Sequence, residues 1–147
     1  MLVTQKCQYA LRALFELALQ GNHKPVKIAL VAERQRIPFR FLEVILSQLK
    51  QGGFVESRRG TEGGYLLARR PEEITVGDIV RFIDGPQIED EQARLEQSDP
   101  PGEVDLFGPI WDQARAAVFQ VFDGLSLADL LAQYEASTRR FVPNYVI

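Results

Sequence analysis

Cysteine and histidine are nearly absent from this chain, which has one residue of each type, Cys7 and His23. One cysteine cannot form a disulfide within the chain, and these two residues cannot assemble a Cys/His zinc site. A catalytic nucleophile and base, or a set of metal ligands, cannot be built around them either. We therefore expect no metal and no enzyme.

Long hydrophobic runs are also missing, since no apolar stretch approaches the roughly eighteen residues that a membrane span needs. Residues 1–6 lead directly into a patterned segment rather than into the apolar stretch of a signal peptide. The 147 residues, of which 46% are hydrophobic and 25% charged, suffice for one main domain with an appendage. We expect a soluble, cytoplasmic protein without a membrane partner.

The charge is divided unevenly along the chain, although the net value is only -3. Residues 1–70 contain twelve Lys/Arg and five Asp/Glu, a balance of +7, whereas residues 71–147 contain five and fifteen, a balance of -10. A basic half suggests a polyanionic partner, because neutralised phosphates supply most of the non-specific affinity for nucleic acid. A solvated basic surface is the alternative that charge alone leaves open.

Two helices are predicted at the start of the chain. Thr4 can cap the first, which ends near residues 21–22. Its apolar positions recur at three- and four-residue spacing and are Cys7, Ala10, Leu11, Leu14, Leu17 and Ala18. The second, shorter helix follows Pro25 and ends in a turn at residues 34–37.

A third helix is predicted from Pro38, which suits a first helical turn because its missing N–H has no partner there, to residues 52–53. Its expected buried stripe consists of Phe41, Leu42, Ile45, Leu46 and Leu49. The opposite face combines a guanidinium, a carboxylate, an aliphatic chain and an amide, groups that recognise base edges in a major groove. The residues of this face are Arg40, Glu43, Val44, Ser47 and Gln48. Without context, the same pattern fits a solvated helix face.

A hairpin provides that context. Residues 54–58 and 65–69 are predicted strands, joined by the loop 59–64 with its three glycines. Three short helices followed by a basic, glycine-rich hairpin predict a winged helix-turn-helix, with the third helix in the major groove and the wing on the backbone or minor groove. A nucleotide-binding loop fits poorly, because the Gly-Lys-Ser/Thr ending and a βαβ unit are missing.

A fourth helix is predicted over residues 76–83, capped by Thr75 with Asp78 and closed at residues 85–86. We place the winged domain at residues 1–84 and an acidic, flexible loop at residues 85–104. This loop contains six carboxylates and one arginine between residues 87 and 103. Their spacing is not that of a calcium loop, so a solvated linker is favoured over a cation site.

The C-terminal segment, residues 105–147, is predicted to contain a long dimerisation helix, a short final helix ending at Tyr134, and an apolar tail of unknown role at residues 141–147. The long helix begins near Asp105 and has a heptad-like apolar seam. The seam residues are Phe107, Ile110, Trp111, Ala114, Val118 and Val121. Folding back on the same domain is the alternative, but two-fold pairing is favoured because helix-turn-helix proteins commonly bind two half-sites.

Together these residues resemble the Rrf2 family of winged-helix repressors, and the resemblance spans nearly the whole chain. Its most specific parts are residues 9–13, 32–35, 41–43, 59–60 and 63–68. Residues 75–80, 84–85 and 125–130 follow in the expected order. The fold expected is mainly α with a small β-hairpin wing, a winged helix-turn-helix plus a long dimerisation helix.

The resemblance implies a dimer in which Arg59 of each wing reaches a minor groove and each third helix lies in a major groove. It identifies Glu43 as the position that tunes sequence preference. The start of the first helix matches the end that approaches the phosphate backbone. The DNA-binding residues implied by pattern and resemblance are Thr4, Lys6, Tyr9, Pro38, Phe39, Arg40, Glu43, Val44, Ser47, Arg58, Arg59 and Gly60.

The chain departs from the cluster-binding members of that family, which have three cysteines in the loop corresponding to residues 87–104. This loop has neither cysteine nor histidine, so no iron–sulfur cluster or other cofactor is expected. Any redox role would fall on Cys7, whose thiolate a helix N-terminus and Lys6 would favour. A small buried core residue is the favoured alternative for Cys7.

The function expected is a dimeric, sequence-specific DNA-binding regulator, a repressor that acts on a pseudo-palindromic operator. Its effector, a small molecule or a partner protein, is not specified by any motif. The alternative is a winged helix that binds protein and no DNA.

Overall fold

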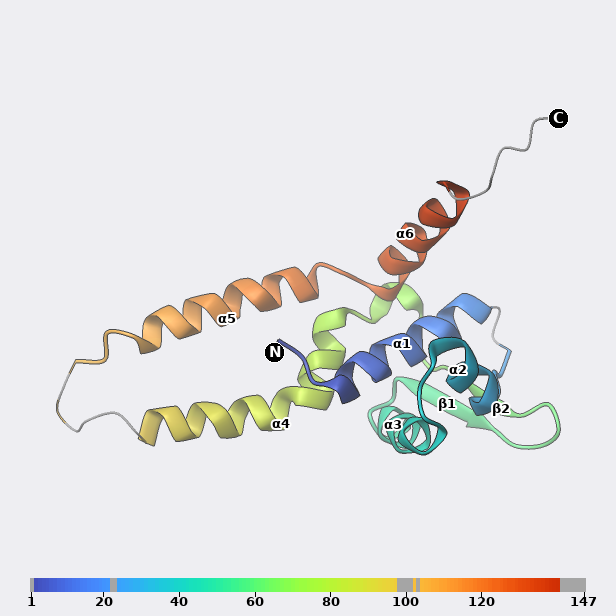
Figure 1. Ribbon diagram of the computed structural model, residues 1–147, viewed down its shortest axis with the longest axis horizontal. Helices are drawn as coiled ribbons and strands as arrows, with labels where there is room; N and C mark the ends of the chain where they lie inside the picture. Colours follow the sequence, from blue (N-terminus) through green and yellow to red (C-terminus); the bar gives the residue numbers. More distant parts are fainter. Residues whose placement is uncertain (1, 22–23, 98–101, 103, 141–147) are drawn as a thin grey trace.

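The computed structural model describes residues 2–21, 24–97, 102 and 104–140 (Figure 1). The elements are α1 (Gln5–Gln20), α2 (Ile28–Gln35), α3 (Phe39–Gln51), β1 (Val55–Arg58), β2 (Gly64–Leu67), the 3-10 helix η1 (Pro71–Glu73), α4 (Val76–Gln97), α5 (Gly108–Asp123) and α6 (Leu127–Arg140). Residues 85–97, 102 and 104–123 project as an arm from the other described residues, which we call the head. The expected fold class, mainly α with a β-hairpin wing, is confirmed.

Helix α1 is the centre of the head and contacts α2, α3, α4, α6 and β2. The predicted cap is confirmed, because the Thr4 hydroxyl accepts a hydrogen bond from the Cys7 amide at 3.1 Å. The helix ends at Gly21, as predicted. Its inner face is fully buried at Cys7, Ala10, Ala13 and Leu14.

Helices α2 and α3 form the expected helix-turn-helix, and the buried stripe of α3 consists of Leu42, Ile45, Leu46 and Leu49. Phe41 was expected in this stripe, which is wrong, because its side chain is 63% exposed. At about 100° per residue, Phe41 lies about 90° from the centre of the four buried positions. An aromatic residue at that angle falls on the flank of the helix.

The hairpin is antiparallel, with Val55 opposite Leu67 and Arg58 opposite Gly64. The wing is also attached to the segment before α2, because Val26 and Tyr65 exchange two backbone hydrogen bonds of 2.7 and 2.8 Å. A side chain at Gly64 would collide with the Val26 carbonyl, so the expected close approach is found at this glycine. The wing and the helix-turn-helix therefore form one unit.

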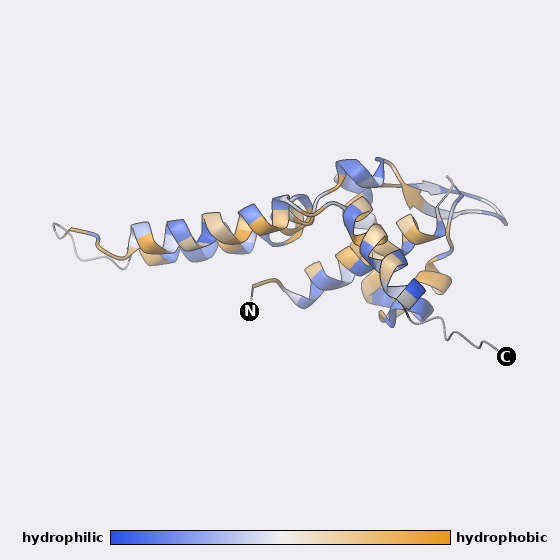
Figure 2. Ribbon diagram, turned by 90° about the horizontal axis from the view of Figure 1, so that it is seen from above, coloured by the Kyte–Doolittle hydropathy of each residue, from blue (hydrophilic) through white to orange (hydrophobic). Residues whose placement is uncertain are grey.

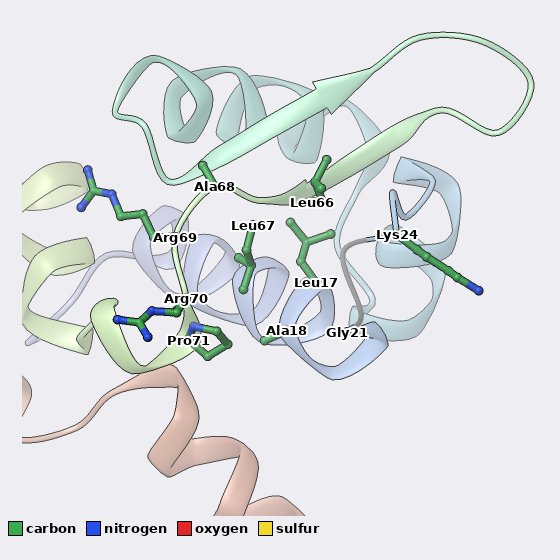
Figure 3. A pocket seen from close by; sticks show the side chains of 10 residues that line it. All are labelled: Leu17, Ala18, Gly21, Lys24, Leu66, Leu67, Ala68, Arg69, Arg70 and Pro71. Atoms are coloured by element: carbon green, nitrogen blue, oxygen red, sulfur yellow. The ribbon is translucent and has the colours of Figure 1, made fainter.

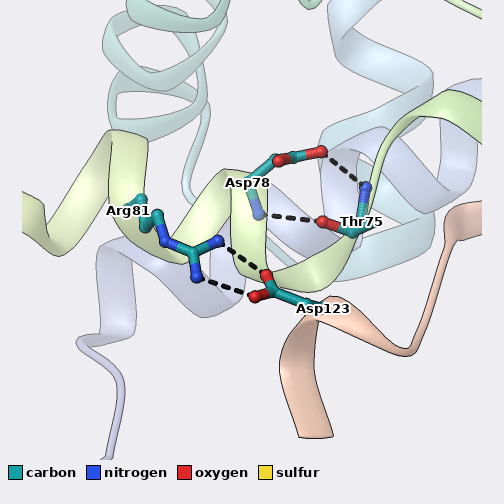
Figure 4. A network of polar contacts seen from close by, with 4 residues as sticks. All are labelled: Thr75, Asp78, Arg81 and Asp123. Carbon is teal, nitrogen blue, oxygen red and sulfur yellow. Dashed lines mark hydrogen bonds and ion pairs between the residues drawn. The ribbon is translucent and has the colours of Figure 1, made fainter. Parts of the chain in front are cut away.

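Helix α4 begins as predicted, with Thr75 and Asp78 capping each other reciprocally at 3.0 Å (Figure 4). It does not end at residues 85–86 but continues to Gln97, so the loop expected at residues 85–104 is helical over most of its length. Ile88 and Leu95 line a groove against α5, and this packing stabilises a helix that Pro86 alone would interrupt. Tertiary packing therefore outweighs the local tendency of Pro86 to end the helix.

Helix α5 begins three residues after Asp105, whose carboxylate accepts hydrogen bonds from the amides of Phe107 and Gly108. At the base of the arm Arg81 makes a bidentate ion pair with Asp123, at 2.6 and 2.7 Å (Figure 4). This pair joins α4 to the last residue of α5.

Helix α6 returns to the head, where Phe15 and Tyr134 make an edge-on ring contact at 5.4 Å. Ser126 and Asp129 cap it reciprocally, and it extends to Arg140 instead of ending at Tyr134. The predicted apolar tail at residues 141–147 lies outside the described residues. None of the helices in the described residues has the length and hydrophobicity required for a membrane span.

Candidate nucleic-acid interface

The outer face of α3 is the first part of the candidate interface. Arg40, Glu43, Val44 and Ser47 are all exposed, on the side opposite the buried stripe. Phe39 and Pro38, at the N-terminal end of the helix, are exposed as well. The structure therefore places the predicted recognition residues together on one accessible ridge, which can enter a major groove.

The wing is the second part. Arg58 forms an exposed ion pair with Glu56 at 3.3 Å, whereas Arg59 has no ion-pair partner among the residues that the structure describes. Gly60 has a φ of 104°, a conformation that only glycine adopts readily, and a Cβ added there would meet no atom within 4 Å. The loop is fastened on its other side by Lys27, whose Nζ donates to the Thr61 carbonyl at 2.6 Å. The wing loop is thus held by Lys27 and exposes the Arg59 guanidinium, which has no ion pair with any described residue.

The start of α1 is the third part, and here two hydrogen bonds occupy Thr4. Its amide donates to the Asp84 carboxylate at 2.9 Å and its hydroxyl donates to the same carboxylate. Asp84 is 4% exposed. In the sequence it belongs to the family resemblance at residues 84–85, but an acidic residue next to a glycine indicates only a turn and no partner on α1. Thr4 therefore offers no free donor for a phosphate, and its role is to join α1 to α4.

Lys6 and Tyr9, unlike Thr4, leave part of their side chains accessible on the surface of α1. Lys6 is exposed, and the Tyr9 hydroxyl accepts a hydrogen bond from Gln5 at 3.0 Å. The Arg12 guanidinium lies over the Tyr9 ring, 5.4 Å from its centre, and adds a cation that sequence patterning did not select. This group can approach a phosphate backbone.

Cys7 is buried in the core with no exposed surface. Burial, and secondarily the Asp84 charge, raise the pKa of the Cys7 thiol to about 12. The favoured interpretation of Cys7 as a small buried core residue is therefore confirmed, and the alternative, a thiolate stabilised by the helix N-terminus and Lys6, is wrong. Desolvation outweighs the helix N-terminus because the sulfur lies beneath the helix and away from solvent.

A second buried carboxylate, Glu16, fastens α1 to the helix-turn-helix. It accepts hydrogen bonds from Gln20 at 2.9 Å and Gln35 at 2.7 Å, and Arg34 lies 3.6 Å away. The signal available in the sequence was an acidic residue inside an otherwise apolar helix face. Glu16 positions α2 and does not face a ligand.

A hollow of about 340 Å³ lies between the end of α1 and β2 (Figure 3). Leu17 and Leu67 point toward one another across it, whereas Lys24, Arg69 and Arg70 extend away. Arg69 is held over the Phe54 ring at 4.3 Å and donates to the carbonyls of residues 52 and 53. The hollow therefore combines leucine side chains with three cationic residues, Lys24, Arg69 and Arg70, among those that line it.

The arm presents an apolar face that the chain does not bury. None of the sixteen residues of α5 is buried, and Ile110, Trp111 and Val121 are 52%, 53% and 62% exposed. Figure 2 shows hydrophobic segments alternating with hydrophilic ones along the arm. The rest of the predicted seam is divided between solvent and the groove against α4: Phe107 and Ala114 are exposed, and Val118 is half-buried.

A face of α5 that adjoins the seam does pack on its own chain. Phe119 and Phe122 adjoin the core of the head, and the Arg81 guanidinium lies 4.5 Å from the centre of the Phe119 ring. The alternative in which α5 folds back on its own domain therefore holds for this face of the helix only. The seam face remains accessible.

Comparison with known proteins begins with a family model that matches residues 3–133 and is described as "Rrf2: Iron-dependent Transcriptional regulator". The described residues contain no group of three or more His, Cys, Asp or Glu side chains able to hold a metal ion. The only cysteine is buried with a raised pKa, and the chain has one histidine. The donor set therefore does not fit the iron that the family description names.

Two curated relatives illustrate the similarity. Protein rrf2 of Nitratidesulfovibrio vulgaris is 33% identical over 131 residues, which cover 89% of this chain and 87% of that protein. The HTH-type transcriptional regulator CymR of Bacillus subtilis is 31% identical over 147 residues, which cover 97% of this chain and 98% of that protein. Both alignments include the head and the arm.

Solved structures agree with these relatives. The structure of T. potens IscR matches with a TM-score of 0.78 and 32% identity, covering 92% of this chain and 89% of that one. The similarity includes the winged helix and the long arm, because nine-tenths of each chain is aligned. The chain therefore belongs to the Rrf2 family of DNA-binding, helix-turn-helix transcriptional regulators.

Proposed function

We propose that this chain is a homodimeric repressor of transcription that binds a pseudo-palindromic operator without an iron–sulfur cluster. The observation that carries the proposal is the pairing of an exposed α3 face with a wing on which Arg59 is free of ion pairs among the described residues. The two elements belong to one fastened unit, since Val26 and Tyr65 tie the wing to the segment before α2. Such a unit can contact neighbouring grooves of one duplex.

In the major groove, α3 would recognise bases through Arg40, Glu43 and Val44. A carboxylate accepts a hydrogen bond from cytosine N4 and is repelled by the acceptor edge of guanine, so Glu43 would set the preferred sequence. Val44 can contact a thymine methyl group. In the minor groove, Arg59 would respond to groove width and potential, and so favour A·T-rich flanks.

Two-fold pairing through the arm supports binding to two half-sites. Ile110, Trp111 and Val121 expose a contiguous apolar surface on α5, and large exposed apolar patches mark interaction sites in soluble proteins. A second copy offers the same surface, which is the requirement for a symmetric interface. The proposed dimer therefore uses the face that the single chain leaves unburied.

The donor set supports the proposal that the protein acts without a cluster. The segment between residues 87 and 104 contains neither cysteine nor histidine, and its carboxylates are hard donors that match sulfide-bridged iron poorly. The signal would then be a small molecule or a partner protein. Cys7 is not proposed as a sensor, because its thiol is buried and its pKa is raised.

The test of this function is Arg59→Ala, with Arg70→Ala as the matched control. Arg70 is also an exposed arginine of the head, but it pairs with Glu73 at 2.8 Å, outside the wing. We expect Arg59→Ala to weaken binding to an operator selected from random duplexes by about tenfold and to remove the preference for A·T-rich flanks. Fluorescence anisotropy over a range of salt concentrations measures both effects.

The outcomes separate the two candidate classes. A wild-type protein whose affinity for duplex falls steeply with salt supports DNA binding, because phosphate contacts release counterions. A wild-type protein that binds no duplex at low salt would favour a winged helix that binds protein alone. Equal losses in the Arg59 and Arg70 variants would remove the wing from the interface.

A further inference from the structure

The turn between α2 and α3 contains a backbone conformation that its residue does not favour. Arg36 has φ 52° and ψ 48°, the left-handed region, and it is the one non-glycine residue with positive φ in the described part of the chain. The turn is closed by hydrogen bonds at both amides: Arg36 donates to the Glu33 carbonyl, and Ile37 donates to the Ala32 carbonyl at 3.0 Å. This is the left-handed helix ending at which glycine is usual.

An L-residue is disfavoured here because its Cβ approaches the following carbonyl oxygen, a contact that glycine avoids. The backbone hydrogen bonds hold the turn in this conformation, but the Arg36 side chain makes no contact in the described head that would favour arginine over glycine. Its side chain is exposed and makes no ion pair or side-chain hydrogen bond with any described residue. By contrast Arg34, two residues earlier, lies 3.6 Å from Glu16. Residues held in such sparsely populated backbone conformations cluster at functional sites.

The position of Arg36 indicates what an arginine in this conformation can contact. It precedes Pro38 by two residues and therefore lies at the N-terminal end of α3, the end at which Phe39 and Arg40 are exposed. In a helix-turn-helix, the first helix crosses the phosphate backbone while the second enters the major groove. A cation at the turn between them can reach a phosphate at the edge of that groove.

We propose that Arg36 is a phosphate-binding residue, which anchors the turn of the helix-turn-helix to the backbone of a duplex. The inference rests on the proposed DNA-binding function and adds a contact that neither the base-recognising face of α3 nor the wing provides. Arg36 and Arg59 then hold the duplex from two separate loops of the head. Because phosphates are the same in every sequence, Arg36 contributes affinity and leaves the preferred motif unchanged.

The experiment is Arg36→Gly, which is expected to move stability and affinity in opposite directions. Removing the side chain relieves the left-handed strain, so Tm should rise by about 2–4 °C. Losing one phosphate contact should weaken operator binding about fivefold at moderate salt and lower the slope of log K against log salt by about one. Thermal unfolding and anisotropy titrations measure the two quantities in the same preparation.

Two further variants separate charge from conformation. Arg36→Lys keeps the cation and the strain, so Tm and the salt slope should remain close to those of the wild type. Arg36→Asn tolerates the left-handed region without a charge, so it should follow Arg36→Gly in affinity. The sequence motif selected from random duplexes should be the same for all four proteins.

The results also distinguish this inference from the proposed function. A wild-type protein that does not bind duplex overturns the proposed function, and with it the phosphate contact inferred for Arg36. If the wild type binds with a steep salt dependence but Arg36→Gly has the same affinity and slope, only the phosphate contact is overturned. A fall in Tm for Arg36→Gly removes the strain argument, and a changed motif would assign Arg36 to base recognition instead.

Discussion

The head and the arm use their apolar residues in opposite ways. Eighteen residues form one buried cluster, drawn from all parts of the head. In α5, by contrast, no residue is buried, and side chains as large as Trp111 are half exposed. Hydrophobicity alone therefore does not distinguish a core helix from a contact helix. The difference is whether neighbouring elements of the same chain cover the apolar face.

The two regions also differ in charge. The basic residues are concentrated in residues 1–70, which include α3 and the wing, and the acidic residues in the second half, which includes the arm. Like charges on the arm discourage it from binding the phosphates that the head attracts. The division fits a molecule in which one region meets DNA and the other meets protein.

The largest expected difference between head and arm is in the stability lost when one apolar side chain of each region is truncated to alanine. Leu46 is fully buried in the head, so Leu46→Ala should lower the free energy of unfolding by about 2–5 kcal/mol. Val121→Ala in the arm should change it by less than about 0.5 kcal/mol at protein concentrations low enough for a monomer. Urea unfolding followed by circular dichroism measures both, and similar losses in the two variants would contradict the division.

The second test concerns association. Trp111→Ala should dissociate the proposed dimer, because aromatic residues within an interface supply much of its binding energy. Leu30→Ala is the control, since Leu30 is an exposed apolar residue of the head. Sedimentation velocity at several concentrations measures the result. A Trp111→Ala protein that still sediments as a stable dimer would exclude the α5 seam as the interface.

The smallest expected effect lies where head and arm meet. Hydrogen bonding to Arg81 lowers the pKa of Asp123 below its ordinary value of 3.8. A carboxylate with a lowered pKa in the folded state stabilises the fold above its unfolded pKa, and this contribution is lost as the pH falls through the folded pKa. Asp123→Asn should therefore lower Tm at pH 7 by about 1 °C, since the pair is exposed, and match the wild type near pH 2.

Thermal unfolding between pH 7 and pH 2 checks this prediction. A difference between Asp123→Asn and the wild type that stays constant over this range would show that ionisation of Asp123 does not contribute. Arg115→Ala is a suitable control, because Arg115 pairs with Asp112 within α5 and does not join the arm to the head.

Local signals predicted most of the helix boundaries in the head. Thr4, Thr75 with Asp78, and Ser126 with Asp129 all cap helices through hydrogen bonds between residues three apart in the sequence. Such bonds depend on a few neighbouring residues, so the sequence is sufficient to identify them. The glycines of the wing were equally predictable.

The candidate site was predictable only in part. The outer face of α3 follows from helical periodicity, and Arg59 from the wing pattern. The carboxylates that hold the site in place, Glu16 and Asp84, were missed because their partners are distant in the sequence: Asp84 contacts Thr4, 80 residues away. The left-handed turn at Arg36 was missed because its residue is not the usual glycine.

The sequence by itself therefore determined the order of the elements, the exposed outer face of α3 and the absence of cysteine and histidine from residues 87–104, all of which depend on residue identity and short-range spacing. Only the tertiary structure decided that α4 continues through Pro86, that Phe41 is exposed and that Cys7 is an inert core residue. These outcomes depend on packing against α5, on the angle around α3 and on desolvation. Each is set by contacts between segments that the chain brings together only on folding.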